Sequence, residues 1–219
     1  MDVRTSPYLA DVTHGAFPRK PAVLRVLHRP GPAFIGISGG EGSYTHIAGR
    51  RYARERGIKL PHFEYLTFVE EVLHKLQEGH IDVGIFGIVN STGGVVEEYM
   101  PFLGHFRWNF VEVITFEVNH MLLALPDTGR DEVRSIVSQE QALRQCPEYL
   151  ATNWPGIEPT PYIDTAMAAK DLAEGTLPLD TAVIASEACV ELYGLQILDA
   201  RIQDKKPNIT SFIVAEPFE

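Results

Sequence analysis

Val83-Gly84-Ile85-Phe86-Gly87-Ile88-Val89 runs directly into Asn90-Ser91-Thr92-Gly93-Gly94, and this junction is the most informative part of the chain. Its first seven residues are almost all apolar and include β-branched side chains, which is typical of a strand buried on both faces of a parallel sheet. The five residues that follow are small, polar or glycine. Ligands bind at the carboxyl ends of strands in open α/β sheets, so this junction predicts either a ligand site or a plain strand end with a helix cap.

Two strand–helix units precede this strand. Ala33–Ile37 is a short apolar strand that enters the glycine loop Ser38–Ser43, and a helical pattern covers Tyr44–Glu55. A strand near Phe63–Tyr65 and an amphipathic helix over Thr67–Glu78 come next. The order β-α-β-α-β predicts a parallel sheet. The glycine loop lacks the Lys of a P-loop and the dinucleotide fingerprint, so it indicates either an anion site at a helix N-terminus or a tight turn.

Two successive strands, near Val111–Val118 and His120–Leu125, break the βα rhythm and predict a second lobe. We therefore expect an N-terminal arm over 1–32, a first α/β lobe over 33–112, and a second lobe over 113–219 that includes the return strand. Two such lobes place a ligand in the cleft between them. The other expected elements are a strand at Val23–Leu27, helices at Val95–Leu103, Gln139–Leu150, Thr165–Glu174 and Ser186–Tyr193, and strands at Ser135–Ser138, Glu158–Tyr162, Ala182–Ala185 and Thr210–Ala215.

Composition limits the classes of partner. The formal net charge of -10 disfavours a nucleic-acid or anionic-membrane partner, because such partners need a basic face. No secretion signal or membrane-spanning apolar run is visible, and Cys146 and Cys189 have no metal-ligand spacing. The eight histidines show no paired-ligand spacing either. We expect a cytoplasmic protein with two buried thiols, no metal and no cofactor, acting on a small molecule.

Several segments together resemble the catalytic domain of the prephenate dehydratases, in register from about Phe34 to Ala215. Gly39–His46 resembles that family's Gly-Pro-Glu-Gly-Thr-Tyr-Ser-His, and Asn90-Ser91-Thr92 matches the end of Glu-Asn-Ser-Thr. One such motif is weak, whereas this many in order are strong. The remaining matches are Ser138–Leu143 with Cys146 to Ser-His-Pro-Gln-Ala-Leu…Cys, Ala182–Glu187 with Leu192–Leu195 to Ala-Ala-Ile-Ala-Ser…Leu-Tyr-Gly-Leu, Ile202–Asp204 to Ile-Gln-Asp, and Asn208–Phe212 to Asn-x-Thr-Arg-Phe.

The resemblance implies an α/β, two-lobed fold of the type II periplasmic-binding-protein kind, with the active site in the cleft between the lobes. It also implies prephenate as the substrate, no cofactor, a homodimer, and Thr210 as the group that assists loss of the ring hydroxyl. Such enzymes usually carry a C-terminal regulatory ACT domain, which is not expected in a chain that ends at Glu219. The candidate substrate-binding residues are Ser43, Asn90, Ser91, Thr92, Ser138, Gln141, Thr165, Asn208, Ser211 and Phe212.

This sequence also departs from the family motifs beside the site. Ser211 stands where the motif has Arg, and Val89 stands where it has Glu. Val96 replaces an Asn, and Gln139-Glu140 replaces His-Pro. Loss of the Arg removes a bidentate carboxylate clamp, for which His46 or His120 is a candidate substitute unless each is an ordinary buried histidine.

Three functions stay open at this point. The first is a prephenate dehydratase, which converts prephenate to phenylpyruvate for phenylalanine biosynthesis. The second is a non-aromatising prephenate decarboxylase of specialised metabolism, which keeps the ring hydroxyl and gives a dihydro-4-hydroxyphenylpyruvate. The third is a two-lobed binding protein without catalytic activity. The retained Thr210 and Asn90-Ser91-Thr92 favour the dehydratase, whereas Ser211 and Val89 favour the decarboxylase.

Overall fold

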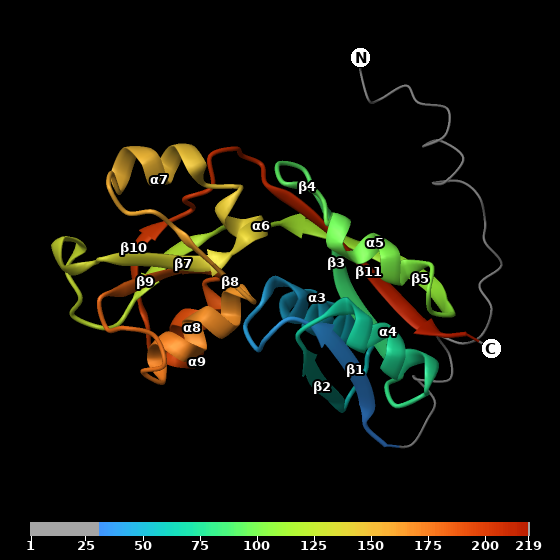
Figure 1. Cartoon of the computed structure of the whole chain (residues 1–219). Coiled ribbons are helices and arrows are strands. Elements are labelled where there is room, and N and C mark those ends of the chain that lie inside the picture. The colour runs from blue at the N-terminus through green and yellow to red at the C-terminus, as the bar shows by residue number, and fades with distance from the viewer. Residues whose placement is uncertain (1–30, 219) are drawn as a thin grey trace, which may run out of the picture.

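The computed structural model describes residues 31–218, which form two α/β lobes, each built on its own sheet (Figure 1). The strand expected at Val23–Leu27, and with it nearly all of the arm expected over 1–32, lies outside the described residues. The two-lobed α/β architecture is confirmed. Within residues 31–218, every helix is too short or too polar to cross a membrane.

The first sheet has six strands and contains the one expected over Val83–Val89. Its order is β2-β1-β3-β11-β5, with β4 paired to β3. Strands β1, β2 and β3 run parallel, and β11 lies antiparallel between β3 and β5. The strands are β1 (Ala33–Ser38), β2 (Pro61–Leu66), β3 (Val83–Asn90), β4 (Gly94–Val95), β5 (Trp108–Glu117) and β11 (Ile209–Pro217).

Helices cover both faces of this sheet. On one face α3 (Tyr44–Glu55) packs against Ile35 and Ile85, and on the other α4 (Val69–Gln77) packs against Phe86. The two short helices η2 (Glu97–Tyr99) and α5 (Met100–Leu103) extend the second layer. The single helix expected over Val95–Leu103 is therefore wrong in its first part, because Val95 continues the β3–β4 ribbon and Pro101 fits only in a first turn.

The second lobe is built on a five-stranded sheet of order β10-β6-β9-β7-β8. Helices α8 and α9 pack on one face of it, and α6 and α7 on the other. Its elements are β6 (Met121–Ala124), η3 (Arg130–Glu132), β7 (Ser135–Gln139), α6 (Glu140–Leu143), α7 (Pro147–Asn153), β8 (Thr160–Tyr162), α8 (Thr165–Ala173), β9 (Thr181–Ala185), α9 (Ala188–Tyr193) and β10 (Gln196–Ala200).

Two local expectations for the second lobe differ from the structure. The helix expected over Gln139–Leu150 is two helices, because Pro147 cannot continue a helix and instead occupies the first turn of α7. Strand β10 was not expected, and it pairs antiparallel with β6. The helix end expected at Gly194 is confirmed, since this glycine caps α9 with a φ of 67°.

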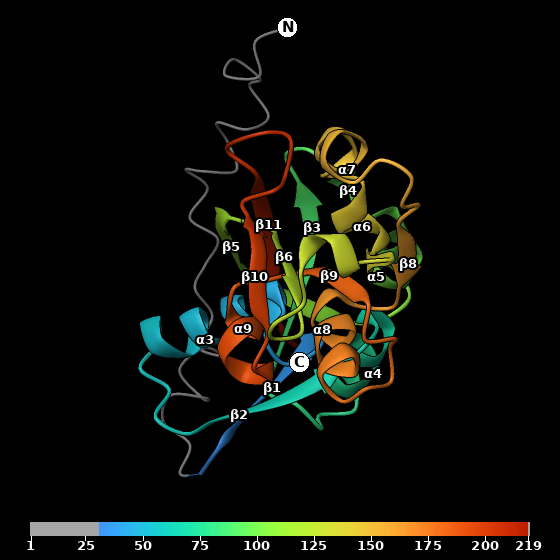
Figure 2. The same ribbon diagram turned by 90° about the vertical axis from the view of Figure 1, so that its left-hand side faces the viewer.

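The chain crosses between the lobes twice, from β5 to β6 and back from β10 to β11 (Figure 1). In Figure 2 the second lobe faces the viewer, with the first lobe behind it. The two crossovers are joined where Val118 N–H donates to the Asn208 carbonyl over 2.7 Å. The lobe boundary expected after residue 112 falls inside β5, whose pairing with β11 continues to Glu117. The return strand β11 likewise belongs to the first sheet and not to the second lobe. Strand patterning identifies strands but not the sheet that each one joins.

Candidate active site

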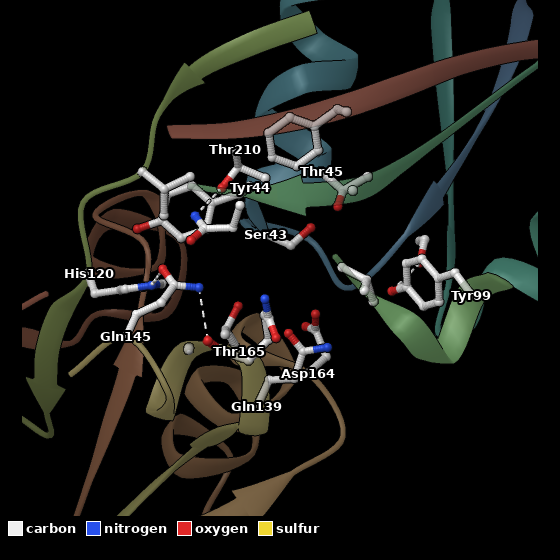
Figure 3. Close-up of a pocket in the computed structure, with 18 of the residues that line it drawn as sticks. Ser43, Tyr44, Thr45, Tyr99, His120, Gln139, Gln145, Asp164, Thr165 and Thr210 are labelled. Atoms are coloured by element: carbon white, nitrogen blue, oxygen red, sulfur yellow. Dashed lines mark hydrogen bonds between the residues drawn. The ribbon is translucent and has the colours of Figure 1, made fainter. Parts of the chain in front are cut away.

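A cleft opens between the lobes at the carboxyl end of β3 (Figure 3). It contains about 760 Å³ of empty space, a volume that includes its open mouth. The first lobe contributes Ser43, Asn90 and Thr210, and the second lobe contributes Gln141 and Thr165. The cleft is therefore completed only when both lobes are in place.

The glycine loop between β1 and α3 forms one wall and is fastened to the second lobe. Gly40 N–H donates to Asp164 Oδ1 over 3.2 Å, and the Tyr193 hydroxyl donates to the Glu41 carbonyl over 2.7 Å. Ser43 is the N-cap of α3, where its Oγ accepts from His46 N–H over 3.2 Å. That bond occupies the Ser43 oxygen as an acceptor, which leaves its hydroxyl hydrogen available to a ligand in the cleft.

Thr210 is held by a chain of two asparagines. Asn90 Oδ1 accepts from Thr92 and Gly93 N–H, which fixes its amide so that Nδ2 donates to Thr210 Oγ1 and to Asn208 Oδ1, each over 2.8 Å. Asn208 is buried, and its Nδ2 donates to the Val118 carbonyl over 3.1 Å. Because Thr210 Oγ1 receives a hydrogen bond from Asn90, the Thr210 hydroxyl hydrogen is free to donate into the cleft.

His120 lies at the inner end of the cleft in one defined tautomer. Gln145 Nε2 donates to the Gln141 carbonyl over 2.8 Å, so Gln145 Oε1 faces His120 Nε2 at 2.9 Å and accepts its hydrogen. His120 Nδ1 is then an acceptor, and it has no partner within residues 31–218. Burial lowers the pKa of His120 to about 4, although the hydrogen bond with Gln145 opposes this shift. The imidazole is neutral at physiological pH.

Gln141 reaches across the cleft to the first lobe. Its buried Nε2 also lacks a hydrogen-bond partner within the described residues. A Cβ at Gly93 would lie 2.4 Å from that nitrogen, so a side chain here would displace the end of Gln141. Gly93 thus leaves room for the Gln141 amide, and Nε2 is a donor offered to a ligand.

The electrostatics of the cleft are set by one carboxylate. Among the described residues that line the cleft there is no Lys and no Arg, and Asp164 is the one charged side chain. Asp164 caps α8 through bonds from Ala166 and Met167 N–H at 2.9 Å. Burial raises the pKa of the Asp164 carboxyl, against backbone hydrogen bonds that lower it.

The structure brings six of the eleven predicted site residues together and leaves five outside the lining. The lining six are Ser43, Asn90, Gln141, Thr165, Thr210 and Phe212. Asn208 lies behind this lining as the support of Asn90. Ser91 Oγ instead accepts from Ile209 N–H over 2.9 Å, which fastens β11 to the turn after β3.

The other three residues outside the lining make hydrogen bonds within the sheets or the turn after β3. Thr92 contributes its backbone N–H to the turn closed by Asn90, and Ser138 Oγ donates to the Ile184 carbonyl inside the second sheet over 2.6 Å. Ser211 lies on the other face of β11 from Thr210, with its hydroxyl 3.2 Å from that of Thr115. Of the two histidines considered as replacements for the missing Arg, His120 lines the cleft and His46 does not. The His46 ring instead accepts from Gly42 N–H over 3.1 Å.

Three departures from the family motifs lie in the wall itself, because Val89, Val96 and Gln139 all line the cleft. Sequence reasoning missed Gln145, Asp164 and Tyr99, whose hydroxyl lies 3.3 Å from that of Ser38. Gln145 is four residues from Gln141, and Asp164 directly precedes an expected helix, so spacing and capping were usable signals. Tyr99 sits in the segment whose structure was expected wrongly.

The described residues hold no cluster of three or more His, Cys, Asp or Glu side chains that could hold a metal ion. Cys146 and Cys189 are free and buried, and burial raises their thiol pKa values to about 12 and about 11. Both thiols are therefore protonated packing groups at neutral pH, as expected for them.

Comparisons with known proteins all indicate the same family. The sequence model of the prephenate dehydratase family matches residues 35–217. The bifunctional chorismate mutase/prephenate dehydratase of Escherichia coli (strain K12) is 28% identical over 192 residues, which cover 84% of this chain and 47% of that protein. Arogenate dehydratase 1 of Petunia hybrida is 32% identical over 181 residues, 82% of this chain and 41% of that protein. The chain thus spans less than half the length of these curated relatives.

Solved structures show the same fold. The prephenate dehydratase of Arthrobacter aurescens in complex with L-Phe superposes with a TM-score of 0.73 at 21% sequence identity. The superposition covers 85% of this chain and 61% of that chain.

Proposed function

Because the chain belongs to the prephenate dehydratase family, we propose that it converts prephenate to phenylpyruvate, carbon dioxide and water in phenylalanine biosynthesis. The observation that carries this proposal is the hydrogen bond from Asn90 Nδ2 to Thr210 Oγ1. It occupies an oxygen lone pair and leaves the threonine hydroxyl as a donor toward the cleft. A dehydratase needs such a donor on the ring hydroxyl, since unassisted hydroxide is a poor leaving group.

In the proposed reaction the bond between the ring and its carboxylate breaks and releases carbon dioxide. Its electron pair enters the ring, and the bond from the opposite ring carbon to the hydroxyl breaks, so that the ring becomes aromatic. The departing oxygen leaves as hydroxide, which takes a proton from the solvent to become water. Thr210 donates a hydrogen bond to the departing oxygen, and Asn90 holds Thr210 in that direction. Thr210 stabilises charge here and does not itself lose a proton.

The walls of the cleft fit the decarboxylation as well. Val89, Val96 and Phe212 are apolar, and a ring carboxylate against them is poorly solvated. Such a carboxylate gains by leaving as neutral carbon dioxide, whereas a cationic clamp would hold it back. The absence of Lys and Arg among the described lining residues is consistent with this requirement.

We propose that neutral hydrogen-bond donors in the cleft bind the carboxylate on the side chain of prephenate. Ser43 offers its hydroxyl at the start of α3, Thr165 offers its hydroxyl at the start of α8, and Gln141 offers an unpaired amide nitrogen. Asn208 acts through Asn90 as a positioning residue. We place Ser91, Thr92, Ser138 and Ser211 outside direct substrate contact, because their side chains do not line the cleft.

The first test is to incubate the purified protein with prephenate at neutral pH and follow the product by ultraviolet absorbance and NMR. Phenylpyruvate with aromatic protons is the expected product. A product with ring alkene and carbinol protons would overturn the dehydratase in favour of the non-aromatising decarboxylase. Tight binding without release of carbon dioxide would instead indicate a binding protein.

Variants of Thr210 then test its role. Thr210→Ala is expected to lower kcat by about 10²-fold or more with a smaller change in KM, because the hydrogen bond matters most in the transition state. Thr210→Ser keeps the hydroxyl and should retain most of kcat. Thr115→Ala is the matched control, since its hydroxyl pairs with Ser211 outside the cleft. Equal kcat values for Thr210→Ala and wild type would remove Thr210 from the mechanism.

Two finer expectations are also part of the proposal. The homodimer rests on the prevalence of dimers among soluble enzymes, and the cytoplasmic location rests on the two free, buried thiols. Light scattering coupled to size exclusion measures the first, and localisation of a tagged protein in its own cell measures the second.

A further inference from the structure

One hydrogen-bond network joins Thr210 to His120 along the wall of the cleft. Asn90 Nδ2 donates to Thr210 Oγ1 and to Asn208 Oδ1, each over 2.8 Å. Asn208 Nδ2 donates in turn to Gln145 Oε1 over 2.7 Å, and this oxygen also accepts from His120 Nε2 over 2.9 Å. Both hydrogens of the Asn90 amide and both of the Asn208 amide are used, so the direction of each bond in the network is fixed.

The two ends of this network have opposite hydrogen-bonding character. At one end the Thr210 oxygen receives a hydrogen bond, so its hydroxyl is a donor. At the other end His120 gives its ring hydrogen to Gln145, so Nδ1 is an acceptor, and it has no partner within residues 31–218. His120 is 2% exposed, so a group bound in the cleft, and not bulk solvent, is what can supply a hydrogen to Nδ1. An unpaired buried acceptor is unfavourable, and a ligand that pairs it gains affinity.

Prephenate has one group that suits both ends. Its two carboxylates and its ketone accept hydrogen bonds but have no hydrogen to donate at neutral pH, so none of them can pair His120 Nδ1. The ring hydroxyl accepts on its oxygen and donates through its hydrogen. Thr210 and His120 line the same cleft (Figure 3). Tyr44 packs edge-on against the His120 ring with 5.6 Å between the ring centroids, which limits rotation of the imidazole.

We propose that His120 is a specificity-determining residue whose Nδ1 accepts the hydrogen of the substrate's ring hydroxyl, while Thr210 donates to the oxygen of the same hydroxyl. This inference rests on the proposed function, because it takes prephenate as the ligand. The two bonds together fix the direction of the hydroxyl and the position of the ring carbon that carries it. The substrate class is a cyclohexadienol with a free hydroxyl hydrogen, and a site built around that hydrogen rejects an analogue that lacks it.

The two bonds act at different stages of the reaction. As the bond between ring carbon and oxygen breaks, the oxygen gains negative charge, so its hydrogen becomes a weaker donor to His120. The hydrogen bond from Thr210 strengthens over the same step. Loss of the His120 acceptor should therefore act mainly on KM, whereas loss of the Thr210 hydroxyl acts mainly on kcat.

Kinetics with prephenate compare wild type, His120→Phe, His120→Asn and His105→Phe. The phenylalanine ring fills the space without an acceptor, whereas the asparagine amide provides an oxygen near the position of Nδ1. Gln145 keeps its hydrogen bond from Asn208 in each variant, so the connection to Thr210 is retained. His105 is exposed and provides the same change of side chain as a control. Circular dichroism and thermal unfolding establish that the variants are folded.

We expect His120→Phe to raise KM about fivefold or more while kcat stays within about threefold of wild type. His120→Asn should recover part of the lost affinity, and His105→Phe should leave KM within about twofold. An unchanged KM in the folded His120→Phe variant, or a loss confined to kcat, would overturn the inference. In either case the dehydratase function itself still stands.

Nitrogen NMR separates this inference from the reaction. The probe is the Thr210→Ala variant with isotope-labelled histidine, in which the resonances of His120 are assigned by their loss in the Thr210→Ala/His120→Asn double variant. Saturating prephenate is expected to shift the Nδ1 resonance, while phenylpyruvate, which lacks the ring hydroxyl, leaves it in place. That pattern supports hydroxyl recognition even if the protein does not dehydrate prephenate. An Nδ1 resonance that prephenate does not move, or that both compounds move equally, contradicts it even if phenylpyruvate is the product.

Discussion

Ser211 and Val89 are register partners in the antiparallel pairing of β11 with β3. They stand where the motifs that the sequence resembles have Arg and Glu. Register partners in an antiparallel pair lie side by side, so the two departures are neighbours. The register would place an Arg at 211 and a Glu at 89 side by side as opposite charges, whereas this chain has a neutral pair there.

This relationship predicts a coupling between the two positions. Ser211→Arg alone should change kcat/KM less than about threefold, because position 211 lies outside the cleft lining. Val89→Glu alone should lower kcat/KM for an anionic substrate roughly tenfold, since it adds a negative charge to the wall. The double variant should recover most of that loss. A double-mutant cycle on kcat/KM is expected to give an interaction energy of about 1–2 kcal/mol, and additive effects would contradict the pairing.

The Asn90–Thr210 bond predicts that activity can be lost while the threonine is kept. In Asn90→Asp, the residue can no longer donate, and the Thr210 hydroxyl would turn to donate to the new carboxylate. We expect kcat to fall on the order of 10²-fold, comparable with Thr210→Ala. Asn153→Asp, on the exposed end of α7, is the matched control. A folded Asn90→Asp variant with wild-type kcat would show that Thr210 needs no orientation by Asn90.

The stability of the first lobe depends on the contact between α4 and β3 at Gly84. A Cβ there would lie 2.6 Å from side-chain atoms of both Leu76 and Val72. Gly84→Ala should therefore lower the free energy of unfolding in urea by about 1–3 kcal/mol through overpacking. Gly104→Ala introduces the same methyl group into open space at a φ of -91° and should change it by less than about 0.5 kcal/mol. Similar values for both variants would argue against a tight α4–β3 contact.

Much of the fold could be predicted because its information is local. The helix Tyr44–Glu55 and the buried strand β3 follow from periodicity and residue type alone, and both are confirmed. The position of β11 could not be predicted in this way. It pairs with β3 and β5 across more than 90 residues of chain, and a strand pattern contains no information about such a partner.

The candidate site likewise contains residues that local sequence predicts and residues whose position depends on tertiary packing. Asn90 and Ser43 were found because polar residues follow strands or precede helices, where ligands bind. Ser211 does not line the cleft, because the alternation of side chains along a strand puts it on the face opposite Thr210. Asp164 was missed because its helix-cap role is visible in the sequence whereas its second role, facing the cleft, depends on the packing of the two lobes.

The neutral state of His120 predicts a dependence of stability on pH. Burial lowers its pKa to about 4 in the folded protein, whereas an unfolded histidine titrates near pH 6.5. Between these values the unfolded chain binds a proton that the folded protein does not, so the free energy of unfolding falls as the pH falls from 6.5 toward 4. The contribution of this one group between pH 7.5 and pH 5 is about 2 kcal/mol.

Urea unfolding at pH 7.5 and pH 5 measures this dependence. His120→Asn should be less stable than wild type at pH 7.5, because it loses the packing against Tyr44, but its loss of stability between the two pH values should be smaller by about 2 kcal/mol. His105→Asn, at an exposed position, should keep the wild-type difference. If His120→Asn and wild type lose equal stability on acidification, His120 has the same pKa in the folded and the unfolded chain. That result would contradict a burial-lowered pKa and the neutral imidazole that follows from it.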